Sequence, residues 1–280
     1  MARVTNRKPP IRRKKASKKK TIFTIKFYVI AFFVLLFIGT TYHYRNAILY
    51  YFSFKTNKIY KEDKVAQARI FQVLKKHSEN VLGFDVSQYQ GKIRWSKVDS
   101  VESLFPLKYV FIRATAGSDK VDYRFKENWR MAKKHNFIRG AYHYYRPNEN
   151  SIEQATNFIK TVQLRKGDFP PVLDIEQLPK NHSIDSLKIG LKRWLKKVEA
   201  HYNVKPIIYT GEKYYESFLK DEFSEYTFWV ANYNFWVENI KEDWLFWQFT
   251  EKAAVEGIDQ KVDLNIYNGT PKMLNYMTIN

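Results

Sequence analysis

An uncharged, strongly apolar run near the N-terminus limits what this chain can fold into. Residues 27–42 carry no Lys, Arg, Asp or Glu, and Val, Ile, Leu and aromatic residues dominate residues 28–38. Inside a bilayer, the backbone polar groups of a single span must bond within the segment, which requires an α-helix. At about 1.5 Å rise, about 20 residues cross the apolar layer. We therefore predict a transmembrane helix at residues 21–44, with Lys26 near enough to its end to reach the headgroups.

The charges beside this run predict its orientation. Residues 1–20 carry ten Lys or Arg and no acid, so they cannot bury a core and form a basic tail. Cytoplasmic flanks are enriched in cations. We therefore place residues 1–20 in the cytoplasm, and everything after about residue 45 on the periplasmic or extracellular side. A cleaved signal peptide is the alternative, although no small-residue cleavage site follows residues 37–41. A soluble core helix fits less well, because the cations directly precede the run.

The net charge of +20 belongs mainly to the front of the chain. Residues 1–79 hold 19 Lys or Arg against 3 Asp or Glu, whereas residues 80–280 hold 29 against 25. The folded part does not continue a basic patch, so we predict no nucleic-acid partner. The chain has no Cys and its six His are scattered. Cys-ligated zinc and thiolate nucleophiles are therefore excluded, and we predict no metal site and no cofactor.

Residues 45–79 have the composition of a stem. Ala66, Ile70, Val73 and Leu74 recur at helical spacing, with Lys and Gln between them. A helix with such a partial apolar stripe can lie along the membrane or simply hold the following domain away from it. The sequence leaves both arrangements open.

From residue 80 onward, segments with strand character alternate with segments of helical periodicity. We predict a domain at residues 80–280 with an α/β fold, an irregular TIM-like β/α barrel whose last part is short of helices. Ser151 and Gln154 stand at capping-box spacing and predict the start of one helix. The predicted strands are Val81–Val86, Tyr109–Thr115, Phe137–Tyr145, Pro171–Ile175, Pro206–Tyr209, Thr227–Ala231, Leu245–Phe249 and Val262–Ile266. The predicted helices are Tyr123–His135, Ser151–Val162, Ile184–His201 and Glu212–Leu219.

Acids stand at the ends of several predicted strands. In the run Pro171–Glu176, Asp174 and Glu176 are two residues apart and so project from the same face of a strand. Their carboxyls can approach within about 5 to 9 Å, the range that glycoside hydrolysis uses. Alone, the pair fits helix capping or surface ion pairs better than catalysis. Asp85 and Asp263 lie at two further strands, and strand ends in a barrel share one mouth. Aromatic residues on neighbouring strands complete an acidic, sugar-binding type of groove: Tyr142, Tyr144, Tyr209 and Trp247.

Motifs spread over about residues 81–270 resemble the glycoside hydrolase family 25 lysozymes, also called Chalaropsis-type muramidases. They occur in order as Gly83–Gly91, Phe111–Thr115, Gly140–Tyr144, Pro171–Glu176, Ile208–Thr210, Trp229–Tyr233, Trp247–Phe249 and Val262–Asn265. The resemblance implies hydrolysis of the β-1,4 bond between N-acetylmuramic acid and N-acetylglucosamine in peptidoglycan. It thereby implies glycan strands as the partner, beside the bilayer at residues 21–44.

The resemblance also implies roles for individual residues. Glu176 would be the general acid and Asp174 its partner carboxylate, while Asp85 and Asp263 would shape and charge the site. The family is thought to use the substrate's own acetamido group as nucleophile, oriented by an aspartate. The predicted sugar contacts come from the aromatic residues above and Asn232, with a place in the core as the alternative for Tyr142, Tyr209 and Trp247. His143 would face away from Tyr142 and Tyr144, as a structural residue.

One departure from the family pattern concerns Ala116, where a Glu usually follows the Thr of the second strand. It motivates a different class of function, a catalytically silent peptidoglycan-binding module. A third class is an envelope scaffold that binds protein partners. The presence of Asp85, Asp174 and Glu176 together favours the enzyme, because a silent module has no physical need for all three.

Overall fold

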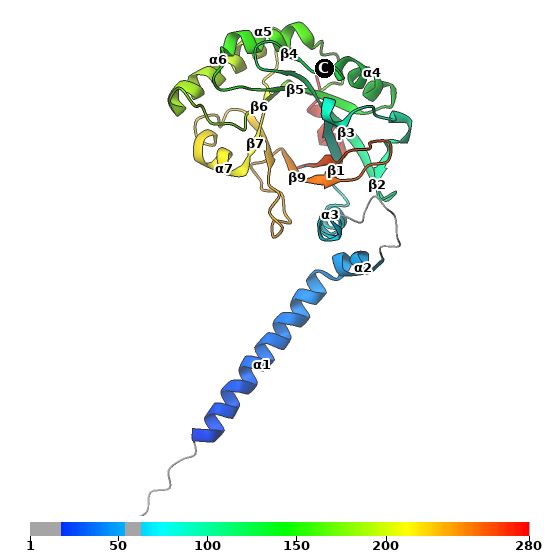
Figure 1. The fold of residues 1–280 in the computed structure, drawn as a ribbon, viewed down its shortest axis with the longest axis vertical. Helices are drawn as coiled ribbons and strands as arrows, with labels where there is room; N and C mark the ends of the chain where they lie inside the picture. Colours follow the sequence, from blue (N-terminus) through cyan, green and yellow to red (C-terminus); the bar gives the residue numbers. More distant parts are fainter. Residues whose placement is uncertain (1–17, 54–62, 280) are drawn as a thin grey trace, which may run out of the picture.

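A computed structural model describes residues 18–53 and 63–279 of the chain. A long helix leads through two shorter ones to a closed barrel, with helices along the upper and left sides of the barrel in Figure 1. Residues 1–17 of the predicted basic tail and residues 54–62 of the predicted stem lie outside the described residues.

Eight strands close the barrel, and each overlaps one predicted strand. They are β1 (Val81–Val86), β3 (Phe105–Ala116), β5 (Ile138–Tyr144), β6 (Val172–Asp174), β7 (Ile207–Gly211), β8 (Thr227–Ala231), β9 (Phe246–Ala253) and β10 (Val262–Tyr267). Neighbours from β1 through β3 to β9 pair in parallel, whereas β10 runs antiparallel to both β9 and β1. The predicted TIM-like barrel is therefore confirmed. The short strands β2 (Ser100–Val101) and β4 (Lys120–Val121) extend β3.

The helical segments on the outside overlap the four predicted helices, and one more, at the C-terminal end, was not predicted. They are α4 (Phe125–Lys134), α5 (Ser151–Thr161), α6 (Ile184–Tyr202), the short α7 (Glu212–Tyr214) with a π-helical turn at Tyr215–Leu219, and the C-terminal α8 (Pro271–Tyr276). The β8–β9 connection carries no helix, as expected for the last part of the barrel.

The start of α5 corrects the predicted capping box. Asn150, not Ser151, is the N-cap, and its side chain accepts from the backbone N–H groups of Ile152 and Glu153. Gln154 is turned away from the helix start and bonds the backbone of Arg146 instead, with its Oε1 accepting at 2.9 Å.

Apolar side chains cover both faces of the barrel sheet. A ring of aromatic residues occupies the interior, where Phe111 stacks on Trp229 with ring centroids 4.4 Å apart. Gly83 makes room for this ring system, because a Cβ there would lie 2.3 Å from the Tyr109 ring. The outward-facing residues of the same strands pack under the helices in a second, larger cluster. Both faces of the sheet are therefore buried, as in other parallel sheets.

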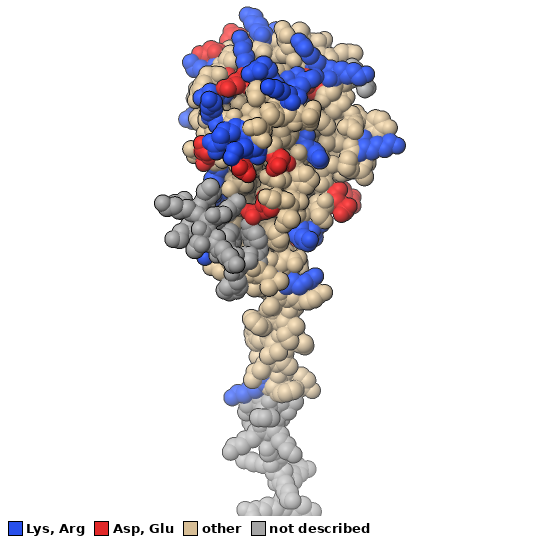
Figure 2. All heavy atoms as spheres, turned by 90° about the vertical axis from the view of Figure 1, so that its right-hand side faces the viewer, with Lys and Arg blue, Asp and Glu red and all other residues tan. Residues whose placement is uncertain are grey.

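The first helix, α1 (Lys18–His43), stands away from the barrel (Figure 1). Its segment Ile25–His43 has a mean hydropathy of 1.9, and none of it is buried. Figure 2 shows hardly any charged side chain on the described part of α1, whereas both signs are mixed over the barrel. The helix is thus long and apolar enough to cross a membrane by length and composition.

The predicted stem contains two helices, α2 (Arg45–Ser53) and α3 (Lys64–Lys76). The apolar stripe of α3 is buried against the barrel, with Val73 fully covered. Arg69 on the same helix donates from Nη1 to the carbonyl oxygen of Phe249 on β9, at 2.7 Å. Part of the stem therefore packs on the barrel wall, an arrangement that neither sequence-based alternative included.

Candidate active site

Asp85 and Asp263 meet at the mouth of the barrel. Asp85 lies near the C-terminal end of β1, and the antiparallel β10 brings Asp263, near its own start, directly opposite in register. Like charges placed opposite each other across two strands repel, so one of the two carboxyls must keep its proton. Burial and the neighbouring Asp85 raise the pKa of Asp263 to about 9. Asp263 therefore holds the proton and donates a hydrogen bond to Asp85.

Two amides hold Asp85 in place. Gln248 Nε2 donates to Asp85 Oδ2 at 2.7 Å, and Asn265 Nδ2 donates to the same oxygen at 2.8 Å. These bonds favour the ionised carboxylate and counter its burial, so the pKa of Asp85 is raised only to about 6. The tyrosines Tyr209 and Tyr233 both donate to Gln248 Oε1, which fixes the amide. No role was predicted for Gln248 or Asn265, although both lie inside family motifs, Trp247–Phe249 and Val262–Asn265.

Asp174 and Glu176 form the second acidic pair. Asp174 ends β6 and is buried, whereas Glu176, two residues on, remains exposed. The two carboxyls lie within hydrogen-bonding reach of each other, which agrees with the side that they were predicted to share. Burial, followed by the charge of Glu176, raises the pKa of Asp174 well above its usual range. Desolvation also raises the pKa of Glu176, although its hydrogen bond with Asp174 opposes this. The pair thus retains a proton at a higher pH than isolated carboxyls would.

Arg113 supplies positive charge close to these acids. Its Nε lies 3.1 Å from Asp122 Oδ2, and its guanidinium lies over the Tyr89 ring, 4.6 Å from the centroid. The charge of Arg113 lowers the pKa of Asp174, although less than burial and Glu176 raise it. Arg113 lies in the family motif Phe111–Thr115, but its place next to the acids was not predicted from the sequence.

Two cavities flank the acidic pair. One of about 750 Å³ is lined by Glu176, Tyr209, Asn232 and Tyr233, together with residues of α7 and the turn after it. The other, of about 460 Å³, includes Tyr144, Ala116 and Arg113. Glu176 therefore borders a groove with aromatic and amide groups, large enough for sugar rings. Ala116 lines the second cavity and not the acidic centre itself.

The structure brings two of the four predicted aromatic residues to the cavities beside the acidic pair. Tyr144 and Tyr209 line cavities, and Tyr142 is half-buried between the barrel interior and the acids. The prediction that Trp247 lines the groove is wrong. It is fully buried on the outer side of β9, where it packs against His77 and donates to the carbonyl oxygen of Asn232 at 3.0 Å. Strand alternation gives the inner position to Gln248 instead.

His143 is confirmed as a structural residue on the far side of β5. It is fully buried between Thr115 Oγ1, 2.7 Å from its Nδ1, and Gln154 Oε1, 3.2 Å from its Nε2. Its ring stacks on Trp194 of α6, with ring centroids 5.5 Å apart. Burial lowers the pKa of His143 to about 4, so the ring is neutral at neutral pH.

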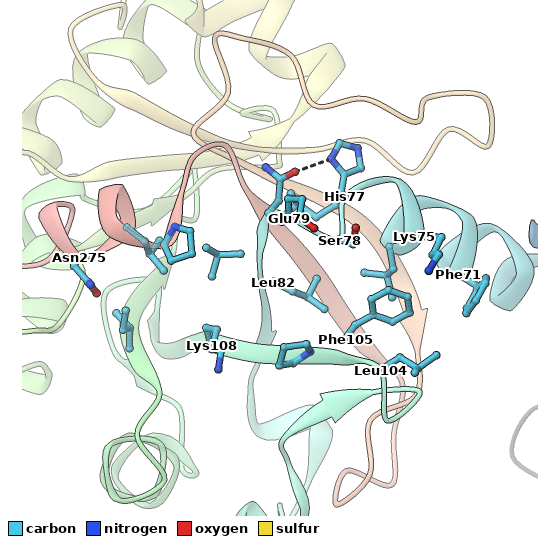
Figure 3. Close-up of a pocket in the computed structure, with 18 of the residues that line it drawn as sticks. Phe71, Lys75, His77, Ser78, Glu79, Leu82, Leu104, Phe105, Lys108 and Asn275 are labelled. Carbon is cyan, nitrogen blue, oxygen red and sulfur yellow. Dashed lines mark hydrogen bonds between the residues drawn. The ribbon is translucent and has the colours of Figure 1, made fainter.

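A further cavity of about 670 Å³ lies at the opposite end of the barrel. It is lined by the starts of β1, β3 and β5 and by α3, and its walls are mostly apolar (Figure 3). Glu79 is the one acid among its lining residues. The cavity therefore lacks the paired carboxyls that distinguish the mouth.

Comparison with known proteins agrees with this architecture. Residues 84–258 match the glycosyl hydrolases family 25. The chain is similar to the uncharacterised protein YegX of Escherichia coli K12, with 39% identity over 70% of this chain and 73% of that one. It is also similar to lysozyme M1 of Streptomyces globisporus, with 31% identity over 70% of this chain and 71% of the other.

A solved structure shows the same fold. The family 25 glycosyl hydrolase from Bacillus anthracis superposes with a TM-score of 0.64 and 28% identity, covering 72% of this chain and 95% of that one. The family match spans more than half of the sequence and includes Asp85, Asp174 and Glu176. This chain therefore belongs to glycosyl hydrolase family 25.

Proposed function

We propose that this protein is a membrane-anchored muramidase that hydrolyses the β-1,4 bond between N-acetylmuramic acid and N-acetylglucosamine in peptidoglycan. Its family membership and its likeness to lysozyme M1 support the reaction. The observation that carries the proposal is the hydrogen-bonded pair Asp174–Glu176, in which a buried carboxyl adjoins an exposed one. A pair of this kind keeps a transferable proton next to the groove.

In the free protein the shared proton resides on Asp174, the more deeply buried member, and its hydroxyl donates to Glu176. A glycan that covers Glu176 removes its remaining contact with water and raises its proton affinity. The proton then moves along the hydrogen bond to Glu176, which donates it to the leaving glycosidic oxygen. Asp174 is left ionised, and this charge orients and stabilises the acetamido nucleophile. In this scheme a single proton is held first by Asp174 and then by Glu176.

Asp85 and Asp263 supply the electrostatic background in this proposal. Asp263 stays protonated and donates to Asp85, while the Gln248 and Asn265 amides keep Asp85 ionised. One fixed negative charge therefore lies at the mouth. It raises the pKa of Asp174 and favours the oxocarbenium-like transition state.

We assign sugar contact to Tyr144, Tyr209 and Asn232, which line the two cavities, and to Tyr142 beside the acids. Aromatic rings offer flat apolar faces to sugars, and amides offer both donors and acceptors for hydroxyl and acetamido groups. Asn232 is oriented by the Glu212 carboxylate, which accepts from its Nδ2, so its side chain is already positioned before a glycan binds.

The anchor is part of the same proposal. We assign residues 1–20 to a cytoplasmic tail, 21–44 to a single membrane span, 45–79 to a stem and 80–280 to the catalytic barrel on the periplasmic or extracellular side. The exposed apolar helix Ile25–His43 supports this assignment. The peptidoglycan substrate lies outside the cytoplasm, which agrees with the orientation that the ten basic residues of the tail favour.

Purified peptidoglycan tests the reaction. Full-length protein in detergent should clear a peptidoglycan suspension and release fragments with muramic acid at their reducing ends, identified by chromatography and mass spectrometry. A soluble fragment for this assay should begin at residue 63, because α3 packs on the barrel. Binding to peptidoglycan without any release of reducing ends would support the silent binding module and contradict the enzyme.

A further inference from the structure

The connection between β8 and β9 runs from the groove to the end of the membrane helix. Its first residues, Asn232 and Tyr233, line the 750 Å³ cavity. Phe235 and Trp236 follow, and each ring lies 6.3 Å from the ring of Tyr44, centroid to centroid. Tyr44 comes directly after the last residue of α1. In Figure 1 this loop descends from the barrel on the side where α2 and α3 lie.

Polar contacts hold this loop against the helices. Glu238 accepts from His43 at the end of α1, with 3.0 Å between Oε2 and Nε2, and it lies 3.6 Å from Lys76 Nζ of α3. The buried Arg69 of α3 donates to three loop carbonyl oxygens, from Nη2 to Asn234 at 2.9 Å and to Val237 at 3.2 Å, and from Nε to Phe235 at 3.4 Å. The loop is therefore attached to the stem and to the membrane helix, not to the barrel alone.

Large apolar side chains in this region nevertheless face solvent. Trp236 is 73% exposed, and Tyr42, two residues before Tyr44 in the chain, is 68% exposed. Trp and Tyr combine an apolar ring with a polar N–H or O–H group, and they gather where a bilayer meets water. Arg45 lies over the Tyr42 ring at 4.2 Å and adds a cation at the same level, as contact with anionic headgroups requires.

We propose that Tyr42, Tyr44, Phe235 and Trp236 form a membrane-interface contact, in which the β8–β9 loop rests on the headgroup region of the bilayer that α1 crosses. This inference rests on the proposed membrane anchoring. It is argued from the continuity of the four residues with the apolar span Ile25–His43. The same loop begins with Asn232 and Tyr233, which line the groove. The contact therefore fixes the distance between this part of the groove and the membrane surface.

Tryptophan fluorescence of the full-length protein in vesicles tests the contact. Vesicles of phosphatidylcholine and phosphatidylglycerol are made with and without brominated acyl chains, which quench only nearby indoles. Trp236 is the one Trp among the exposed large apolar residues. We therefore expect quenching in the wild type and the loss of most of it in Trp236→Phe. Trp129→Phe is the matched control, since Trp129 lies on α4 under Arg139 and its removal should leave the quenching unchanged.

Vesicle flotation separates this inference from the anchoring on which it rests. Co-flotation of the wild type and both variants, with equal quenching in the wild type and Trp236→Phe, would overturn the loop contact and leave the anchor standing. Failure of the wild type to float with vesicles would overturn both. Selective loss of quenching in Trp236→Phe, with flotation intact, supports the contact.

Discussion

Replacement of Glu176 by Gln tests the proposed proton donor most directly. Glutamine keeps the size and hydrogen-bonding capacity of the side chain but has no proton to transfer. The charge of Glu176 is the largest cause, after burial, of the raised pKa of Asp174. Neutralising residue 176 therefore also lowers the pKa of Asp174, while burial, the larger cause of the raised pKa, remains. The variant should lack a usable acid at position 176.

The expected loss follows from the value of general acid catalysis. A positioned acid contributes about 10²–10⁴-fold, or roughly 3 to 5.5 kcal/mol of activation free energy. Turnover of Glu176→Gln should fall by at least about 10²–10⁴-fold. Its sedimentation with insoluble peptidoglycan should stay at the wild-type level. The alkaline limb of the wild-type rate–pH profile, which reports the protonated pair, should also disappear from the residual activity.

Initial rates of reducing-end release, measured across pH, are the assay. Glu153→Gln is the matched control, because Glu153 is an exposed Glu in the first turn of α5 on the outside of the barrel, and its rate should equal that of the wild type. Retention of wild-type turnover by Glu176→Gln would remove Glu176 from the mechanism and refute the assignment of the proton to this pair.

Four further predictions concern other parts of the molecule. Ala116→Glu should change the initial rate by about tenfold at most, or roughly 1.4 kcal/mol, because Ala116 lines the second cavity beside Arg113 and Arg146; a gain of several orders of magnitude would instead indicate drift away from catalysis. The folded-state pKa of Asp263 is raised to about 9 from a usual 3.8, so its contribution to stability is complete below about pH 4 and is lost as the pH rises through 9. Asp263→Asn should therefore flatten the decline of melting temperature between about pH 4 and 9, and parallel curves for variant and wild type would contradict the proton assignment. Arg69→Ala should lower the free energy of unfolding by about 2 to 4 kcal/mol, since it removes the guanidinium that donates to the carbonyl oxygens of Phe249 and Asn234. Urea titration checks this, with Arg69→Lys as the milder variant. The cellular protein should remain intact in the membrane fraction, and a fully active soluble form with a new N-terminus near residues 41–48 would show cleavage instead.

Local sequence patterns determined much of the fold. The apolar run at residues 27–42 is sufficient to define α1, because its composition and length depend on no other part of the chain. The strand segments follow from short runs of β-branched and aromatic residues between helical periodicities. Asp174 and Glu176 share a face because side chains alternate along any strand. Each of these inferences uses neighbours within a few residues, and the structure agrees with each.

Other features depend on partners distant in sequence. Trp247 and Gln248 lie in a strand that is buried on both faces, so alternation alone could not show which one points toward Asp85. Gln154 matched a capping-box spacing, but the barrel recruits it to Arg146 and His143, and the cap passes to Asn150.

The tertiary structure also decided how the acids and the stem are arranged. Asp263 meets Asp85 because β10 runs antiparallel, a choice of strand direction that no local pattern encodes. The docking of α3 depends on Arg69 reaching carbonyl oxygens about 170 residues further along the chain. The sequence by itself therefore determined which residues form helices, strands and candidate acids. Only the closed barrel decided which acids pair, which of them keep a proton and which aromatic residues face the groove, because these properties arise from contacts between distant segments and from the water that those contacts exclude.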